Sequence, residues 1–269
     1  AKNDQIILGA FDDLVRGLDG RVRDPSEIGE TFTQTVNAGR SALTKQYGEG
    51  LTNIQQQFAG KFIDTSNLKS AVDKRIADGT IDFDSIDPAI RTVYEEISLL
   101  PQSMNADRAL EFLKKHNNTL SNLLDPRGQG YNSAASAQMT EFLDDVLKPS
   151  IKAGLAKADP QAYVEYQKLN KFYKDGKDSL TPKLLEAVAR QGTAGNFTAV
   201  GSTLFGSTKA DVVDAAFNAL TKAKKINPDL NIREATEALR QGYLTQFFGS
   251  EGRSIDQLRT AAKGIESNT

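Results

Sequence analysis

Apolar residues recur at helical spacing along most of the chain, and the longest such stripe lies between Pro25 and Phe62. Its positions are Ile28, Phe32, Val36, Leu43, Tyr47, Leu51, Ile54, Phe58 and Phe62, with Gly39 in the slot between Val36 and Leu43. The stripe repeats roughly every 3.8 residues, close to the ~3.6 residues of an α-helical turn. Asp24 as N-cap and Pro25 at the first helical position are a typical helix start. We therefore predict a long amphipathic helical segment over residues 25–62, which we call the spine.

Glycines leave the continuity of the spine open. Each glycine inside a helix costs up to about 1 kcal/mol relative to alanine, and the spine contains Gly39, Gly48, Gly50 and Gly60. The closely spaced Gly48 and Gly50 mark the most favourable place for a break. The pattern is compatible with one long helix or with two helices, 25–47 and 51–62, joined by a turn.

The rest of the chain shows shorter helical patterns separated by Pro, Gly and Asp signals. They predict helices at about residues 4–18, 68–78, 88–100, 103–124, 133–149, 160–175, 182–192, 196–205, 207–224, 232–249 and 255–265. Residues 125–130 form the clearest loop, and Pro149 is expected either to kink or to end its helix. Ile81 and Phe83 alternate with polar residues over too short a span for a strand. The predicted fold is all-α, with about eleven helices and no strand.

We expect two regions along the chain, divided softly near residues 79–101. Residues 1–80 would form an extended helical region that contains the spine, and residues 81–269 a compact multi-helix body. No repeat of fixed period emerges that would indicate a solenoid. A chain of 269 residues is long enough for one large domain or two ordinary ones.

Composition narrows the function classes without choosing one. The net charge of −2 gives no basic face for nucleic acid, and the absence of cysteine removes disulfides, thiolate metal sites and cysteine catalysis. No apolar run approaches the ~18 residues of a membrane span, so no transmembrane segment is expected. The chain begins at Ala1 without Met. Whether it is complete or a fragment is left open.

Residue patterns that carry chemistry are mostly missing from the sequence. There is no phosphate-binding glycine loop, nucleophile elbow or zinc-protease motif. His116, the single histidine, stands among Lys114, Lys115, Asn117 and Asn118 and is expected to be solvated on a polar helix face. We predict no catalytic residue, no cofactor, no metal site and no small-molecule substrate. The expected class is therefore not an enzyme.

Two further patterns favour packing or solvation over ligand binding. The acidic pairs Asp12-Asp13, Glu95-Glu96 and Asp144-Asp145 are adjacent on helices, so their carboxylates point about 100° apart and do not face each other across a cleft. A row formed by Tyr163, Tyr166 and Tyr173 is typical of helix packing with the hydroxyls at the rim.

Several segments of the second half of the chain form a distinctive pattern when taken in order. One segment is Asp159-Pro160-Gln161-Ala162-Tyr163, continuing through Tyr166 to Leu169-Asn170-Lys171-Phe172-Tyr173. It is followed by Gly201-Ser202-Thr203-Leu204-Phe205, by the helix 212–220 and by Arg240-Gln241-Gly242-Tyr243-Leu244. In this order they resemble helical parts of the internal or ejection proteins of short-tailed bacteriophages, and the resemblance covers roughly residues 100–250. It rests on pattern and order and includes no catalytic signature.

The resemblance implies a structural role in the virion. Proteins of this kind are packaged in the particle, leave it ahead of the genome and assemble in the host envelope into a conduit for DNA. The implied partners are other copies of the chain and other virion proteins, with passive contact to DNA. The implied location is the virion interior or tail, with release into the host envelope. Longer family members carry a peptidoglycan-cleaving domain, of which this sequence shows no sign.

A second hypothesis keeps the helices but changes the biology. The chain would be a helical protein-binding module, such as a bacterial effector or scaffold, that docks through the spine. A third hypothesis is an enzyme with an acid-dependent cleft. Under the first two hypotheses the candidate interface residues are Ile28, Phe32, Val36, Leu43, Tyr47, Ile54 and Phe58. The alternative is that these side chains pack on their own chain.

Overall fold

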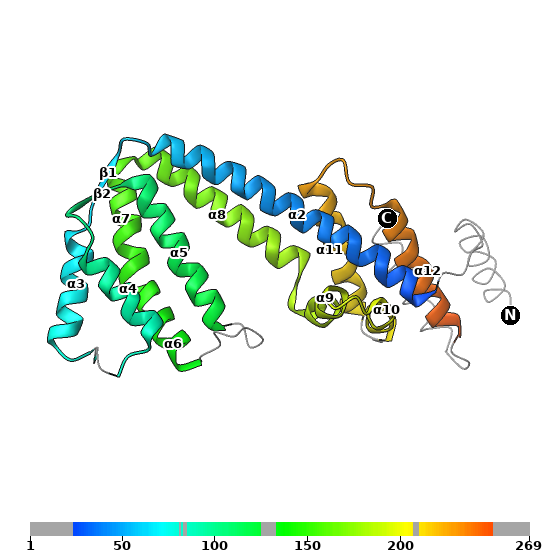
Figure 1. Ribbon diagram of the computed structural model, residues 1–269. Helices are drawn as coiled ribbons and strands as arrows, with labels where there is room; N and C mark the ends of the chain where they lie inside the picture. Colours follow the sequence, from blue (N-terminus) through cyan, green and yellow to red (C-terminus); the bar gives the residue numbers. More distant parts are fainter. Residues whose placement is uncertain (1–23, 81, 83–84, 125–132, 207–209, 250–269) are drawn as a thin grey trace. The chain divides into compact units, whose positions relative to one another are not determined.

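The computed structural model describes residues 24–80, 82, 85–124, 133–206 and 210–249 (Figure 1). Within these ranges the chain is helical apart from turns and two three-residue strands, so the predicted all-α class is confirmed. Five expectations lie outside the described residues: the helices at 4–18 and 255–265, the acidic pair Asp12-Asp13, the loop at 125–130 and the Ile81–Phe83 alternation. None of the described helices is both long and apolar enough to cross a membrane.

The helices follow the predicted patterns closely in number and order. They are α2 (Pro25–Gln57), α3 (Ser66–Ala77), α4 (Pro88–Ser98), α5 (Ala106–Leu124), α6 (Ser133–Phe142), α7 (Lys148–Ala158), α8 (Pro160–Leu180), α9 (Glu186–Thr193), α10 (Phe197–Gly206), α11 (Ala210–Ile226) and α12 (Arg233–Gly249). A π-helical turn, Leu143–Leu147, joins α6 to α7, and a 3-10 turn, Lys183–Leu185, precedes α9.

The spine is one helix, and it ends earlier than the apolar stripe predicts. α2 continues through Gly48 and Gly50 to Gln57, which excludes the two-helix alternative. Gly50 serves packing, because a Cβ there would lie 2.8 Å from Cδ1 of Leu169 on α8. The chain then turns at Gly60, whose φ of 73° is in the region that favours glycine. Phe62, the last position of the stripe, is 60% exposed in a strand.

A small sheet replaces the start of one predicted helix. β1 (Phe62–Asp64) pairs antiparallel with β2 (Ser103–Asn105), placing Ile63 opposite Met104. Both of these side chains are buried, whereas their strand neighbours are not. Thr65 extends the pairing by donating its N–H to the carbonyl oxygen of Gln102 at 3.0 Å. The helix expected from Ser103 therefore begins at Ala106, and the expectation of no strand is wrong.

The chain divides into two compact units at Tyr47/Gly48, within α2, and at Asn170/Lys171, within α8. We call them unit 1 (described residues 24–47 and 171–249) and unit 2 (described residues 48–170). Each has its own apolar core. The expected boundary at 80/81 does not separate them, because residues 48–80 belong to the same unit as residues 81–170. Unit 1 is built from two parts of the chain that are distant in sequence.

Helical structure continues past two positions at which an end was expected. Asp175-Gly176 was expected to end α8, but the helix runs on to Leu180. Gly176 is buried, and a Cβ there would lie 2.7 Å from Cδ1 of Leu43, so glycine allows α8 to approach α2. Pro149 does not end the helical structure, because it lies near the start of α7. A π turn precedes it, with the Lys148 N–H donating to the carbonyl oxygen of Leu143 five residues back, which accommodates a ring that would clash in a regular helix.

Candidate functional site

The spine side chains that were expected to form an interface lie in the two cores instead. Ile28, Phe32, Val36 and Leu43 are 1–5% exposed in the core of unit 1. In unit 2, Ile54 is 4% exposed and Phe58 is 0% exposed. Tyr47 is half-buried and stacks on Tyr173 with ring centroids 4.4 Å apart. Apart from Tyr47, the chain itself covers these side chains, so a partner would reach the other six only after a core had opened, which corrects the expected interface.

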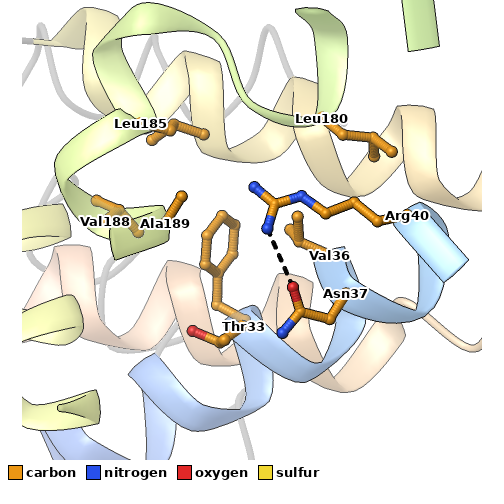
Figure 2. Close-up of a pocket in the computed structure, with 9 residues that line it drawn as sticks. Thr33, Val36, Asn37, Arg40, Leu180, Leu185, Val188 and Ala189 are labelled. Carbon is orange, nitrogen blue, oxygen red and sulfur yellow. Dashed lines mark hydrogen bonds between the residues drawn. The ribbon is translucent and has the colours of Figure 1, made fainter. Parts of the chain in front are cut away.

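Unit 1 has a shallow concavity beside the spine, lined mainly by apolar side chains, with the side chain of Arg40 extending among them (Figure 2). Its volume is about 280 Å³ when the space open to solvent is included. It is lined by Phe32, Thr33, Val36, Asn37, Arg40, Leu180, Leu185, Val188 and Ala189. The residues come from α2, the end of α8, the following 3-10 turn and α9. The concavity lies along one face of α2, because Phe32, Val36 and Arg40 are spaced at i, i+4 and i+8.

Arg40 is the one charged side chain among the described residues that line this concavity. Its Nη1 donates to Oδ1 of Asn37 at 3.1 Å, and its Nη2 donates to Oγ1 of Thr181. Partial burial lowers the pKa of Arg40 below its usual value. Thr181 directly follows the last residue of α8, and a cation at a helix C-terminus is stabilised by the helix dipole. Arg40 therefore has a structural role in holding the end of α8 against α2.

His116 lies where the sequence did not predict it. It is 1% exposed on α5, in unit 2, so the expectation of a solvated side chain is wrong. Its ring meets Phe112 edge-on, with centroids 4.3 Å apart. The polar neighbours Lys114 to Asn118 hid a clear signal. Leu113, His116, Leu120 and Leu123 share the spacing of one helix face, and that face is the buried one.

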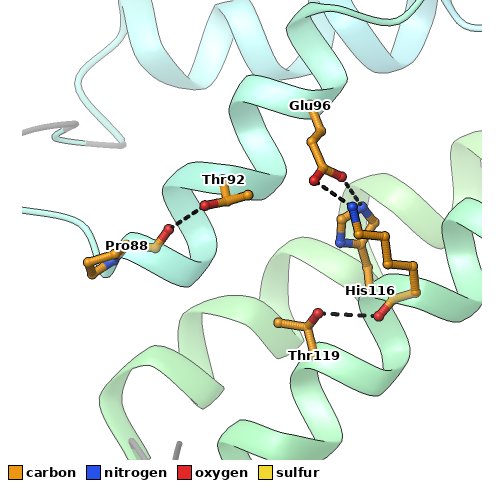
Figure 3. Close-up of polar contacts among 6 residues, drawn as sticks. Pro88, Thr92, Glu96, His116 and Thr119 are labelled. Atoms are coloured by element: carbon orange, nitrogen blue, oxygen red, sulfur yellow. Dashed lines mark hydrogen bonds and ion pairs between the residues drawn. The ribbon is translucent and has the colours of Figure 1, made fainter.

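The surroundings of His116 combine burial with one nearby carboxylate (Figure 3). Oε2 of Glu96, on α4, lies 3.4 Å from the His116 Nε2. The other Glu96 oxygen accepts from Lys115 Nζ at 2.5 Å. Neither ring nitrogen of His116 has a hydrogen-bond partner within the described part of the chain. Burial lowers the pKa of His116 to about 4, against the opposing pull of Glu96. The imidazole is therefore neutral at pH 7.

A second polar group in unit 2 surrounds Tyr94, which is 2% exposed and packs on Phe142 with centroids 4.5 Å apart. Burial raises the pKa of Tyr94 to about 12, so its phenol stays protonated. Arg75 lies nearby, with Nη1 3.5 Å from Glu141 and Nη2 4.0 Å from Asp145. This arrangement anchors a buried phenol and offers no nucleophile.

The acidic pairs do not converge on a common site. Asp144 accepts from Lys148 on its own helical segment at 2.6 Å, whereas Asp145 faces Arg75. Glu96 faces Lys115 and His116. Asp12 and Asp13 lie outside the described residues. The described part of the chain contains no cluster of three or more His, Asp or Glu side chains able to hold a metal ion.

The segments that carry the phage resemblance lie at helix starts and helix contacts. Oδ1 of Asp159 accepts from the N–H groups of Gln161 and Ala162 at 3.1 and 3.0 Å and so caps α8. Leu204 on α10 is 1% exposed in the core of unit 1. A Cβ at Gly242 on α12 would lie 2.2 Å from Cζ of Phe205, so glycine there lets α12 meet α10. Half-buried Tyr163 and Tyr166 pack on the core of unit 2, as expected.

Comparisons with protein-family models, with curated proteins and with solved structures find no match for this chain.

Proposed function

We propose that this chain is a structural protein of a bacteriophage virion, an internal or ejection protein that assembles with itself or with other virion proteins during genome delivery. The observation that carries the proposal is the placement of the resembling segments. Asp159 caps a helix, and Phe205 and Gly242 form a close contact between helices. These residues maintain the helices and their packing, and no ligand is needed to account for them. Such a role fits a structural protein.

Assembly would use the outer surface of the folded units, because the spine side chains are already buried. Within the described part of the chain, the large apolar side chains that remain exposed are Phe62, Leu99, Leu124, Val164, Phe172 and Leu184. Leu99 is 83% exposed and Phe62 is 60% exposed, both in unit 2. Single exposed apolar residues are common on proteins, so these positions are starting points for mapping an interface rather than a defined patch.

The same exposed residues favour a second candidate, a helical protein-binding module without a virion role. Both candidates bind protein partners, but they differ in self-association. A conduit protein is expected to form an oligomer of defined stoichiometry, whereas a docking module is expected to be a monomer of 29.3 kDa. The proposal does not include catalysis, a cofactor or a small-molecule substrate.

Two measurements test the proposal. The first is the mass of the purified chain by sedimentation equilibrium over about 1 to 100 µM, a range wide enough to detect association by mass action. A defined oligomer that dissociates in a Leu99→Ser/Phe62→Ser variant would support assembly. A matched Leu124→Ser variant reports whether the loss of any exposed leucine has the same effect.

The second measurement places the protein in a particle. Density-banded particles are prepared from the phage or prophage that encodes the chain, and its copy number per genome is quantified by mass spectrometry. Several copies per particle would support a virion role. Absence from the particles, together with a monomeric mass at all concentrations, would overturn the proposal in favour of the docking module.

A further inference from the structure

The only histidine of the chain is buried in unit 2 without a hydrogen-bond partner among the described residues. A buried polar group is normally hydrogen-bonded, because leaving water without a partner costs free energy. The cost is tolerable for a neutral imidazole that packs against Phe112, but it rises steeply for an imidazolium cation. The packing around His116 therefore distinguishes sharply between its two protonation states.

We propose that His116 is an acid-sensitive latch of unit 2. The neutral ring completes the packing of α5, and on mild acidification it takes up a proton and leaves the core, so that unit 2 opens while unit 1 stays folded. The inference does not depend on a virion role and is tested independently of it.

The charges around the ring explain why the proton is not accommodated in place. Glu96, from α4, favours protonation across 3.4 Å, and Lys115, from α5, opposes it. These are the charged groups found to act on the ring within the described residues. Because Lys115 already occupies one oxygen of Glu96 at 2.5 Å, the carboxylate offers the imidazolium only a shared partner. Burial then outweighs Glu96, and the pKa of His116 falls to about 4.

The direction of the pH effect follows from proton linkage. An opened unit 2 exposes His116 with an ordinary pKa near 6.5, whereas the closed unit holds it near 4. Between these values only the opened state binds the proton. The equilibrium constant for closing unit 2 is therefore at its maximum above pH ~6.5. It falls about tenfold for each pH unit between pH ~6.5 and pH ~4.

The latch is specific to one unit because the chain has a single histidine. Unit 1 has no group of this type, so acid between pH 6.5 and 4.5 acts there only through carboxylates. Carboxylates in both units form the common background. A variant that removes only the imidazole separates the latch from that background.

Amide hydrogen exchange on the full chain, corrected for the intrinsic pH dependence of exchange, is the decisive experiment. We compare the natural chain with His116→Leu, which fits an apolar site, between pH 7 and 4.5. Below pH ~6.5, the protection of unit 2 amides should fall about tenfold more per pH unit in the natural chain than in His116→Leu. The protection of unit 1 amides should be the same in both. A matched variant, His116→Leu/Asn118→His, moves the histidine to an exposed position on the same helix and should not restore the loss.

A second measurement needs no variant of the buried residue. The carbon-bound ring protons of His116 give one histidine titration by NMR. Closed unit 2 should show no imidazolium down to pH ~5, and any protonated signal should come from the opened state. A titration near pH 6.5 with unit 2 still protected would overturn the latch, as would equal loss of protection in the natural chain and in His116→Leu.

Discussion

Glycine stands in α2 for two different physical reasons. A Cβ at Gly39 would lie 2.7 Å from Cβ of Ala223 and 3.0 Å from its Cα, so the residue lets α11 approach α2 closely. At Gly48, in contrast, a Cβ would meet nothing within 4 Å, and the residue is exposed in the same helix. Sequence alone treats the two glycines as equal weaknesses of one helix. The structure gives them opposite roles.

Alanine at these two positions should therefore change stability in opposite directions. Gly48→Ala gains helix propensity and should stabilise the protein by up to about 1 kcal/mol. Gly39→Ala gains the same propensity but forces two backbones apart, a clash that typically costs about 1 to 3 kcal/mol. Urea unfolding of both variants measures the difference. If Gly39→Ala were as stable as Gly48→Ala, the close contact between α2 and α11 would be contradicted.

At the scale of elements, the sequence predicted best what local hydrogen bonds decide. Oδ1 of Asp87 accepts from the N–H of Ala89 at 2.9 Å, Asn196 accepts from Ala199 at 3.1 Å, and Asn231 accepts from Arg233 at 3.1 Å. Each cap involves residues two or three positions apart, so its signal lies within a few letters of sequence. The expected starts at residues 88, 196 and 232 lie within one residue of the observed starts of α4, α10 and α12.

The sequence failed where the deciding partner is distant in the chain. The sequence predicts a helix end at Gly176, but the helix continues there, and a Cβ at this position would lie 2.7 Å from Cδ1 of Leu43, more than a hundred residues away. Ile63 and Met104 form strands only because they pair with each other. His116 was interpreted from its polar neighbours although its own helix face is apolar. The burial of His116 could have been predicted from its spacing on α5, but its contact with Glu96 could not, because Glu96 lies on another helix, α4.

The Asp159 cap allows a direct test at this scale. Asp159→Ala removes the acceptor for two N–H groups at the start of α8 and should destabilise the protein by about 1 kcal/mol, within the usual range for such caps. Asp159→Asn keeps an acceptor oxygen and should lose much less. Thermal unfolding of the two variants makes the comparison. Equal losses would mean that the charge of Asp159 matters more than the cap.

For the whole molecule, the two units arise from a division that linear sequence does not display. Residues 24–47 and 171–249 share the core of unit 1, although the whole of unit 2 separates them in the chain. The predicted boundary at 80/81 assumed that neighbours in sequence fold together. The contacts instead divide the chain within α2, beside Gly48, and within α8, and both helices continue across these divisions.

Separate cores predict separate responses to cavities. Leu43 is 1% exposed in the core of unit 1, and Phe58 is 0% exposed in the core of unit 2. Leu43→Ala should cost about 2 to 5 kcal/mol and Phe58→Ala about 3 to 5 kcal/mol, because each leaves a cavity in a close-packed core. Amide exchange at pH 7 should locate the lost protection in unit 1 for Leu43→Ala and in unit 2 for Phe58→Ala. Loss in both units from either substitution would mean that the cores unfold as one cooperative structure, and the two-unit description would then fail as an account of stability.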